Sequence, residues 1–220
     1  MCRHCEAKLR PLPGRLCASC GDMLPGLMTL GLGRCLRCRQ TLPAFDRACA
    51  WGAYGKELRQ LIRHFKYAGH PRLSDLLAGL MFNASAGRKW PRPDGLVPVP
   101  SHHKRLARRG FDPALLLARG LSGRLNVPVL SVARRIRRTA PQFGLDEESR
   151  RRNLKSAFRI QGKMKLKNSS LWIVDDILTT GTTVGELARA LRGAGAKTIN
   201  VLVVARAVRR FHGSSIRCQK

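Results

Sequence analysis

The chain has 220 residues, of which 44% are hydrophobic, and a formal net charge of +29. This length and apolar content suit one α/β domain with a small appendage and exclude a disordered basic protein. No segment approaches the ~20 consecutive apolar residues that a membrane-spanning helix needs. The N-terminal sequence MCRHCEAKLR lacks the apolar core of a signal peptide. We therefore expect a cytoplasmic protein without a membrane span.

The charge comes from 42 Lys and Arg residues against 13 Asp and Glu residues, and the pI is about 11.5. This excess is larger than solubility requires and attracts anions over a long range. Nucleic acid is the first partner that the charge predicts, and an anionic membrane surface is the second. A general bias of the sequence toward arginine would account for a part of the excess.

Residues 1–48 are rich in Cys, Gly, Pro and Arg and show no sustained apolar period, which predicts a small module held by metal. Six cysteines form three CxxC pairs. Two such pairs can supply four thiolates to one zinc ion, and a reducing compartment favours structural zinc over a redox dithiol. The first choice of ligands is Cys2, Cys5, Cys17 and Cys20, and the rival second pair is Cys35 and Cys38. Three pairs cannot complete two sites, so one pair is spare or a fourth lies upstream of Met1.

Two amphipathic helices are predicted next. Apolar residues recur at helical spacing over 58–65 and over 73–81, as expected for helices that pack on a core. The basic residues outside these apolar stripes predict a partly solvated positive face; they are Lys56, Arg59, Arg63, Lys66 and Arg72.

The middle of the chain predicts a strand, a basic loop and a helix. Residues 95–100 form a short buried-type strand, and the loop over 101–112 offers a second place for an anion. Candidate ligands of nucleic acid or pyrophosphate in this loop are Arg105, Arg108 and Arg109. A helix is predicted over 113–125 and a strand over 127–132.

The most basic stretch covers residues 134–155, where arginines surround a loop that contains Pro141 and Gly144. Phe143 in this loop can stack on a base or anchor the loop on the core, and we expect the anchor. The arginines predicted to bind nucleic acid or pyrophosphate here are Arg137, Arg138, Arg150, Arg151 and Arg152.

The most specific pattern is the segment LWIVDDILTTGTT over 171–183. A strand that ends at Asp175 and Asp176 leads into a Thr/Gly loop and then into a helix over 183–194. Hydroxyls, backbone N–H groups and a helix N-terminus suit a phosphate, and adjacent carboxylates suit ribose hydroxyls or a hydrated magnesium ion. The alternative is an ordinary strand-to-helix turn that is capped by threonines. With a strand over 198–205, the segment predicts a β-α-β unit.

This segment resembles the motif with which type I phosphoribosyltransferases bind 5-phosphoribosyl-1-pyrophosphate (PRPP). Carried over by position, the resemblance places the ribose, and catalysis, at Asp175 and Asp176. It places the 5′-phosphate at Thr179, Thr180, Gly181, Thr182 and Thr183.

Nearly the entire chain resembles the ComF/GntX family of phosphoribosyltransferase-like proteins. Besides the CxxC pairs and VDDILTTGTT, the matching segments are Tyr54-Gly55, Lys66-Tyr67, Val97–Pro100, Arg108–Phe111, Arg137–Thr139 and Arg151–Leu154. Members with a fuller double zinc ribbon carry four CxxC pairs, and Asp112 stands where the family usually has Asn. The resemblance implies a type I phosphoribosyltransferase-like parallel sheet with flanking helices over 49–208. It adds an N-terminal zinc ribbon over 1–48, and a basic tail follows over 209–220.

Three functions follow from these features. The first is a protein of DNA uptake and natural transformation that binds single-stranded DNA, carries a PRPP-type site and works with other DNA-uptake proteins. The second is an active phosphoribosyltransferase, a PRPP-dependent glycosyltransferase with magnesium, on an unidentified acceptor in nucleotide metabolism. The third is a metal-stabilised adaptor that has kept only the fold, which the intact loop disfavours. The chain has no glutaminase domain to generate ammonia for an amidophosphoribosyltransferase.

Overall fold

The computed structural model describes residues 8–24, 33–136, 157–161 and 166–208. At its centre lies a four-stranded parallel sheet with the strand order β1-β6-β5-β2. The strands span Arg47–Ala53 (β1), Gly95–Pro98 (β2), Ser170–Leu178 (β5) and Thr198–Arg206 (β6). The central strands β5 and β6 are buried along most of their length, which explains their long apolar runs.

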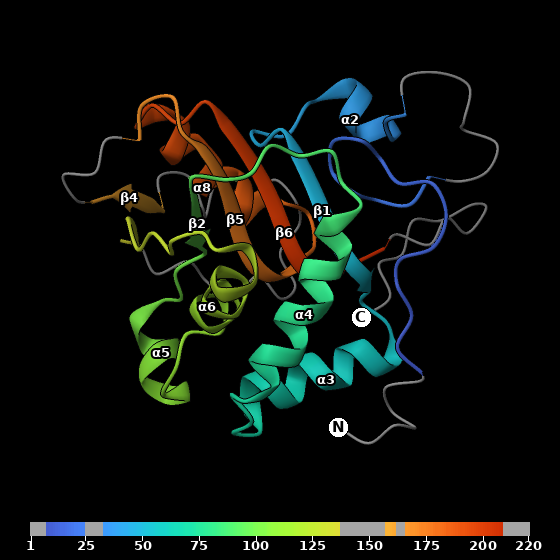
Figure 1. The fold of residues 1–220 in the computed structure, drawn as a ribbon, viewed down its shortest axis with the longest axis vertical. Coiled ribbons are helices and arrows are strands. Elements are labelled where there is room, and N and C mark those ends of the chain that lie inside the picture. Colours follow the sequence, from blue (N-terminus) through green and yellow to red (C-terminus); the bar gives the residue numbers. More distant parts are fainter. Residues whose placement is uncertain (1–7, 25–32, 137–156, 162–165, 209–220) are drawn as a thin grey trace.

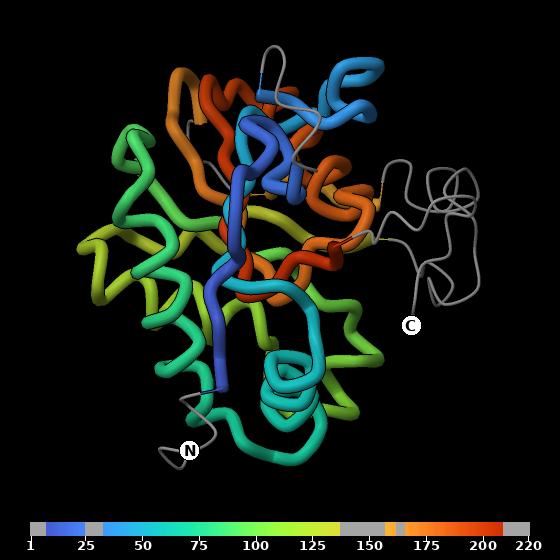
Figure 2. The backbone as a smooth tube through the Cα atoms, turned by 90° about the vertical axis from the view of Figure 1, so that its right-hand side faces the viewer, coloured from blue at the N-terminus to red at the C-terminus, as the bar shows by residue number. Residues whose placement is uncertain are grey.

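Helices cover both faces of the sheet (Figure 1; Figure 2). On one face, side chains such as Phe65, Leu77 and Leu117 pack with Trp172 of β5. On the other face, Leu187 packs with the opposite side of the sheet. The first group belongs to α3 (Lys56–Tyr67), α4 (Leu73–Ala86) and α6 (Pro113–Leu125), and the second to α8 (Thr182–Gly193).

Smaller elements complete the described structure. A two-stranded antiparallel sheet joins β3 (Ala133–Arg135) to β4 (Phe158–Ile160), which lies against α8. Two short helices are α2 (Leu36–Gln40), next to the cysteine-rich segment, and α5 (His103–Arg109), after β2. In the part of the chain described, no helix combines the length and the apolar composition of a membrane span.

Both outer strands of the sheet are covered by other backbone. Along β1, the N–H of Leu12 donates to the carbonyl of Trp51 at 2.7 Å. Along β2, Leu96 exchanges backbone hydrogen bonds of 2.9 and 2.8 Å with Pro128 and Leu130. The segment before the cysteines is therefore part of the sheet's packing, and Leu9 lies in the same core as α3 and α4.

The predicted fold class and the helix over 113–125 are confirmed. Asp112 explains the start of α6, because its carboxylate accepts from the N–H groups of Ala114 and Leu115 while Pro113 occupies the first turn. The carboxylate also accepts from the N–H of Ser101 at 2.8 Å. An acid at position 112 thus ties the start of α6 to the segment that follows β2.

Three local predictions need correction, and one strand was not predicted. β1 was not expected, because its sequence RACAWGA has no β-branched residue and its pairing with β6 creates the strand. The basic loop over 101–112 contains α5. Its one large apolar residue, Leu106, cannot form the apolar period by which a helix is recognised in the sequence.

The predicted strand over 127–132 makes only one isolated bridge among the described residues, from Val129 to Leu96, because Pro128 has no N–H to donate. β5 does not end at the carboxylates but continues to Leu178.

The predicted domain boundary after residue 48 stays a prediction. β1 begins at Arg47 and pairs with β6 from its first residue. The predicted tail over 209–220 lies outside the described residues.

Candidate functional site

A pocket of about 330 Å³ opens at the edge where the parallel strands end. The chain after β1 and β2, the last part of β5 and the start of α8 form its walls. Open α/β sheets bind their ligands at this edge. The predicted site residues that line the pocket are Arg105, Arg109, Asp175, Asp176, Thr179, Gly181 and Thr183.

The two adjacent carboxylates have different environments. Asp176 is 7% exposed, and its Oδ2 lies 2.7 Å from the ammonium nitrogen of Lys66 on α3. Burial lowers the pKa of Lys66, but Asp176 and the nearby Asp175 more than offset this, and the net pKa shift is upward. Lys66 is therefore a cation that neutralises Asp176.

Asp175 is different because burial, and next the charge of Asp176, raise its pKa to about 8. One of its oxygens accepts from the N–H of Asp176 at 2.8 Å. A carboxyl group with a pKa raised this far is mostly protonated at neutral pH and loses its proton when a cation approaches it. Of the two carboxyl groups, Asp175 is therefore the one whose carboxylate form a bound cation would stabilise more, because Lys66 already neutralises Asp176.

Positive groups form another part of the pocket wall. Arg105, Arg109 and Arg135 all line the pocket. Burial, and then the charge of Arg105, lower the pKa of Arg135, but a guanidinium remains charged. The guanidinium carbon of Arg109 lies 4.9 Å from the ring centroid of Tyr67 at the pocket wall. Crowded arginines of this kind favour a ligand that carries several negative charges.

The loop over 179–183 joins β5 to α8. Gly181 adopts the left-handed conformation with φ 82°, and α8 begins at the next residue. The hydroxyls of Thr180 and Thr182 lie 2.7 Å apart, and the N–H of Thr182 points to Thr180 Oγ1 at 3.4 Å. Thr180 and Thr182 therefore hold the loop together, while Thr179, Gly181 and Thr183 face the pocket. A glycine-containing loop at a helix N-terminus suits a phosphate.

Four cysteines lie together near β1. The sulfurs of Cys17, Cys20, Cys35 and Cys38 all lie within 4.8 Å of one another. The N–H of Cys35 donates to the sulfur of Cys17 at 3.3 Å. The described cluster thus joins Cys17/Cys20 to the rival pair Cys35/Cys38, and the first-choice partners Cys2 and Cys5 lie outside the described residues.

The protonation of these thiols fits a metal site. Hydrogen bonds from Cys20 and Cys38 hold the pKa of Cys17 far below its ordinary value. The bond to Cys17 raises the pKa of Cys20 to about 12, and bonds to Cys17 and Cys20 also raise the pKa of Cys38. Without a cation, a thiolate at Cys17 is thus stabilised by neighbouring thiols. A dication such as zinc would stabilise four thiolates at once.

The other predicted anion ligands are placed only in part. Arg108 lies exposed on α5 and does not line the pocket. The remaining candidates of the basic stretch lie outside the described residues; they are Arg137, Arg138, Arg150, Arg151 and Arg152, together with Phe143.

Two charged residues of the pocket wall are not among the site residues that the sequence predicts. Lys66 is predicted on a solvated basic face, but its side chain is only 17% exposed and is paired with Asp176. Arg135 belongs to a basic stretch, and its sequence context does not assign it to a site. The one sequence signal for Lys66 is that Lys66-Tyr67 is among the segments that resemble the family. Local spacing could not reveal its partner Asp176, which lies far along the chain.

The sheet, the strand-loop-helix and the pocket at the strand ends define a phosphoribosyltransferase-type domain. Residues 106–213 match the phosphoribosyl transferase domain family. Among solved structures, the purine phosphoribosyltransferase from Pyrococcus horikoshii is similar, with 20% identity over 64% of this chain and 75% of that chain and a TM-score of 0.37.

Two curated relatives identify the family more closely. Competence protein F of Haemophilus influenzae is 31% identical over 94% of this chain and 96% of its own length. The DNA utilization protein YhgH of Escherichia coli K12 is 35% identical over 87% of this chain and 84% of its own length. The chain belongs to this ComF/GntX family of competence and DNA utilization proteins with a phosphoribosyltransferase-like domain.

Proposed function

We propose that this protein takes part in DNA uptake, binds single-stranded DNA and holds PRPP with magnesium in the pocket at the strand ends. The pocket carries the proposal, because it combines a carboxylate pair, three arginines and a Thr/Gly loop within one cavity. The names of the relatives, Competence protein F and DNA utilization protein, support the cellular role.

Each part of PRPP has suitable groups in this pocket. The loop over 179–183 suits the 5′-phosphate, and Asp175 and Asp176 suit the ribose hydroxyls. Arg105, Arg109 and Arg135 suit the pyrophosphate, which a magnesium ion would help to neutralise. The raised pKa of Asp175 supports the metal, because a nearby dication stabilises the carboxylate form.

Calorimetry with PRPP and magnesium tests the site directly. Wild type should bind PRPP, and Asp175→Asn should weaken binding about tenfold or more, since a charged hydrogen-bond acceptor is lost. Asp75→Asn is the matched control, because Asp75 pairs with Arg124 at 2.9 Å away from the pocket. Absence of PRPP binding to wild type would overturn the site.

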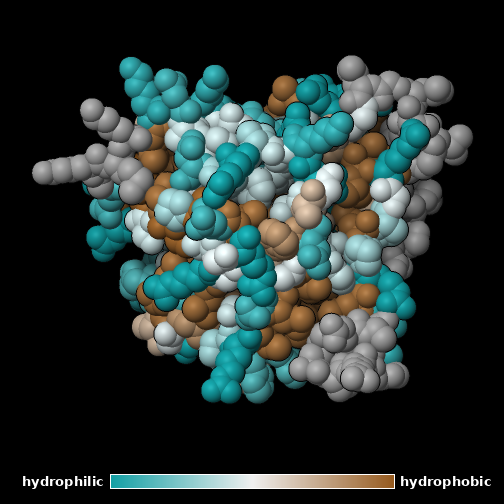
Figure 3. All heavy atoms as spheres, viewed as in Figure 1, coloured by the Kyte–Doolittle hydropathy of each residue, from teal (hydrophilic) through white to brown (hydrophobic). Residues whose placement is uncertain are grey.

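The DNA proposal rests on the surroundings of the pocket. Arg105, Arg108 and Arg109 come from the one short helix α5, and Tyr67 is 65% exposed beside Arg109. An exposed ring among cations is the combination that binds unpaired bases along a strand. Hydrophilic side chains extend outward over much of the face in Figure 3. With a net charge of +29, the protein attracts DNA beyond the pocket mouth as well.

An active phosphoribosyltransferase is the second candidate. The same pocket would stabilise positive charge on the ribose through Asp175 and Asp176 and the leaving pyrophosphate through the arginines. Release of pyrophosphate from PRPP in the presence of candidate acceptors, lost in Asp175→Asn, would support this function. PRPP binding without pyrophosphate release for any nucleobase or amine acceptor would argue for binding alone.

A further inference from the structure

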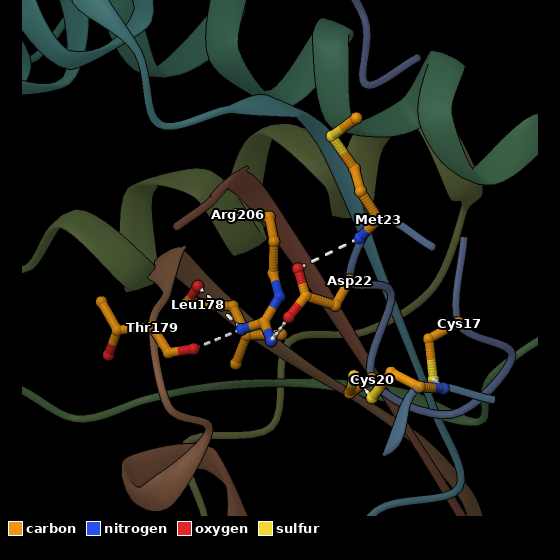
Figure 4. Close-up of polar contacts among 8 residues, drawn as sticks. Cys17, Cys20, Asp22, Met23, Leu178, Thr179 and Arg206 are labelled. Carbon is orange, nitrogen blue, oxygen red and sulfur yellow. Dashed lines mark hydrogen bonds and ion pairs between the residues drawn. The ribbon is translucent and has the colours of Figure 1, made fainter. Parts of the chain in front are cut away.

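A buried arginine connects the cysteine cluster to the loop that precedes α8. Arg206, the last residue of β6, is 3% exposed. Its Nη1 donates to the carbonyl of Leu178 at 3.0 Å and to the carbonyl of Thr179. Its Nη2 lies 3.3 Å from Oδ2 of Asp22. Figure 4 shows the guanidinium between these two groups of partners, with Cys17 and Cys20 beside Asp22.

The position of Asp22 depends on the turn that carries Cys17 and Cys20. The carbonyl of Asp22 accepts from the N–H of Cys17 at 2.7 Å, and its Oδ1 accepts from the N–H of Met23 at 3.1 Å. Gly21, between Cys20 and Asp22, has φ +66°, and a Cβ at this position would lie 2.7 Å from the Ala48 carbonyl oxygen. The turn is therefore pressed against β1, and the Asp22 carboxylate is fixed by the same backbone that places two of the sulfurs.

The other partners of Arg206 are the start of the phosphate loop. Leu178 ends β5, and Thr179 is the first residue of the loop over 179–183. A second contact reaches the same loop from the segment between α2 and β1. Phe45 is 4% exposed, and its ring lies 3.7 Å from the place of a Cβ on Gly181. Two segments that flank cysteine ligands thus support one loop.

We propose that the Cys17/Cys20/Cys35/Cys38 site sets the conformation of the phosphate loop through Asp22 and Arg206. Metal at the cysteines fixes the turn, the turn fixes Asp22, and Asp22 holds the guanidinium that orients the carbonyls of Leu178 and Thr179. Asp22 and Arg206 are positioning residues, and metal loading and PRPP binding are thermodynamically coupled. This coupling rests on the proposed function, and by linkage it acts equally in both directions.

The experiment compares zinc-loaded wild type, metal-stripped wild type and zinc-loaded Asp22→Asn. Removal of zinc should weaken binding of PRPP with magnesium about tenfold, within the usual range of coupling between two sites. Asp22→Asn should reproduce this loss while its zinc content is unchanged, because Asp22 is not a ligand. Saturating PRPP should raise zinc affinity, measured by chelator competition, by the factor seen for PRPP. Asp75→Asn is again the control and should behave as wild type.

A readout without PRPP separates this proposal from the proposed function. Hydrogen exchange of the amides over 179–185 should be faster in Asp22→Asn and in metal-stripped protein than in zinc-loaded wild type. If PRPP fails to bind wild type but this difference is present, the ligand assignment is wrong and the coupling stands. Equal exchange in zinc-loaded wild type and Asp22→Asn would overturn the coupling, and so would equal PRPP affinity in the two proteins where wild type binds PRPP. Asp22→Asn keeps the proposal testable even if stripped protein unfolds.

Discussion

At the scale of residues, Asp175 and Asp176 are chemically identical neighbours with opposite tasks. Asp176 forms an ion pair with Lys66 at 2.7 Å, and both side chains are largely buried. The pKa of Asp175 is raised to about 8, first by burial and then by Asp176. If Asp175 binds a cation as proposed, its burial without that cation lowers the stability of the protein without ligand.

The first prediction concerns the pH dependence of Asp175. Because its pKa is raised in the folded state from 3.8 to about 8, ionisation opposes folding. Its contribution to the free energy of unfolding is largest below pH 4 and falls as pH rises toward 8. Asp175→Asn should therefore be more stable than wild type at pH 8.5, by about 1–2 kcal/mol after allowance for solvent screening, and the difference should shrink by pH 5.5. Urea unfolding at three pH values measures this, and parallel pH profiles would contradict it.

At the scale of elements, the cysteine cluster should behave as a closed metal site. We predict about one zinc per chain, with four thiolate ligands. Because the pKa of Cys20 is raised to about 12 and that of Cys38 is also raised, protons compete with zinc. Zinc should be released as pH falls, and proton release should accompany its binding.

Metal analysis of variants checks this prediction. Cys38→Ser should lose zinc, whereas Cys49→Ser should keep it, since Cys49 is buried in the core of α3 and α4 and bonded to the Ala84 carbonyl. Chelation should unfold the cysteine-rich module first. Full zinc content in Cys38→Ser would return Cys2 and Cys5 to the ligand set.

The helix α5 carries the next prediction. Replacing Arg105, Arg108 and Arg109 together by Gln should lower the slope of log affinity against log salt for single-stranded DNA by about two to three units. The same change at Arg150, Arg151 and Arg152 tests the other basic segment. A control with equal loss of charge replaces the exposed, dispersed residues Arg72, Arg119 and Arg189. If all three triple variants show the same slope, general charge and not α5 binds the phosphates.

The outcome at each element reflects how far apart the interacting residues lie along the chain. The motif over 174–183 was readable because strand, carboxylates, loop and helix are contiguous. Lys66 was misassigned because a lysine outside an apolar stripe looks solvated until its carboxylate partner on another strand is known. Arg206 was not identified at all, since Asp22 is 184 residues away. β1 exists through its pairing with β6, which local propensity does not encode.

At the scale of the whole molecule, a net charge of +29 attracts any nucleic acid. Duplex DNA has the higher charge density, so preference for single strands must come from stacking. We predict that Tyr67→Ala weakens single-strand binding by about 1–3 kcal/mol and leaves duplex binding unchanged. Leu106→Ala is the control, because Leu106 is 41% exposed on α5 but offers no ring. Strong duplex preference in wild type would contradict the proposed role.

The cover along β1 has a consequence for handling the protein. Residues 10–12 lie along this outer strand and lead directly into the turn of Cys17. Because that segment is continuous with the turn of Cys17, we expect loss of metal to loosen it, and an uncovered strand is a template for pairing with a second chain. Chelator should therefore cause aggregation, seen as light scattering, that zinc prevents when added beforehand but does not reverse afterwards. Trace zinc during expression, and purification tags that need no chelator, would keep the protein dispersed.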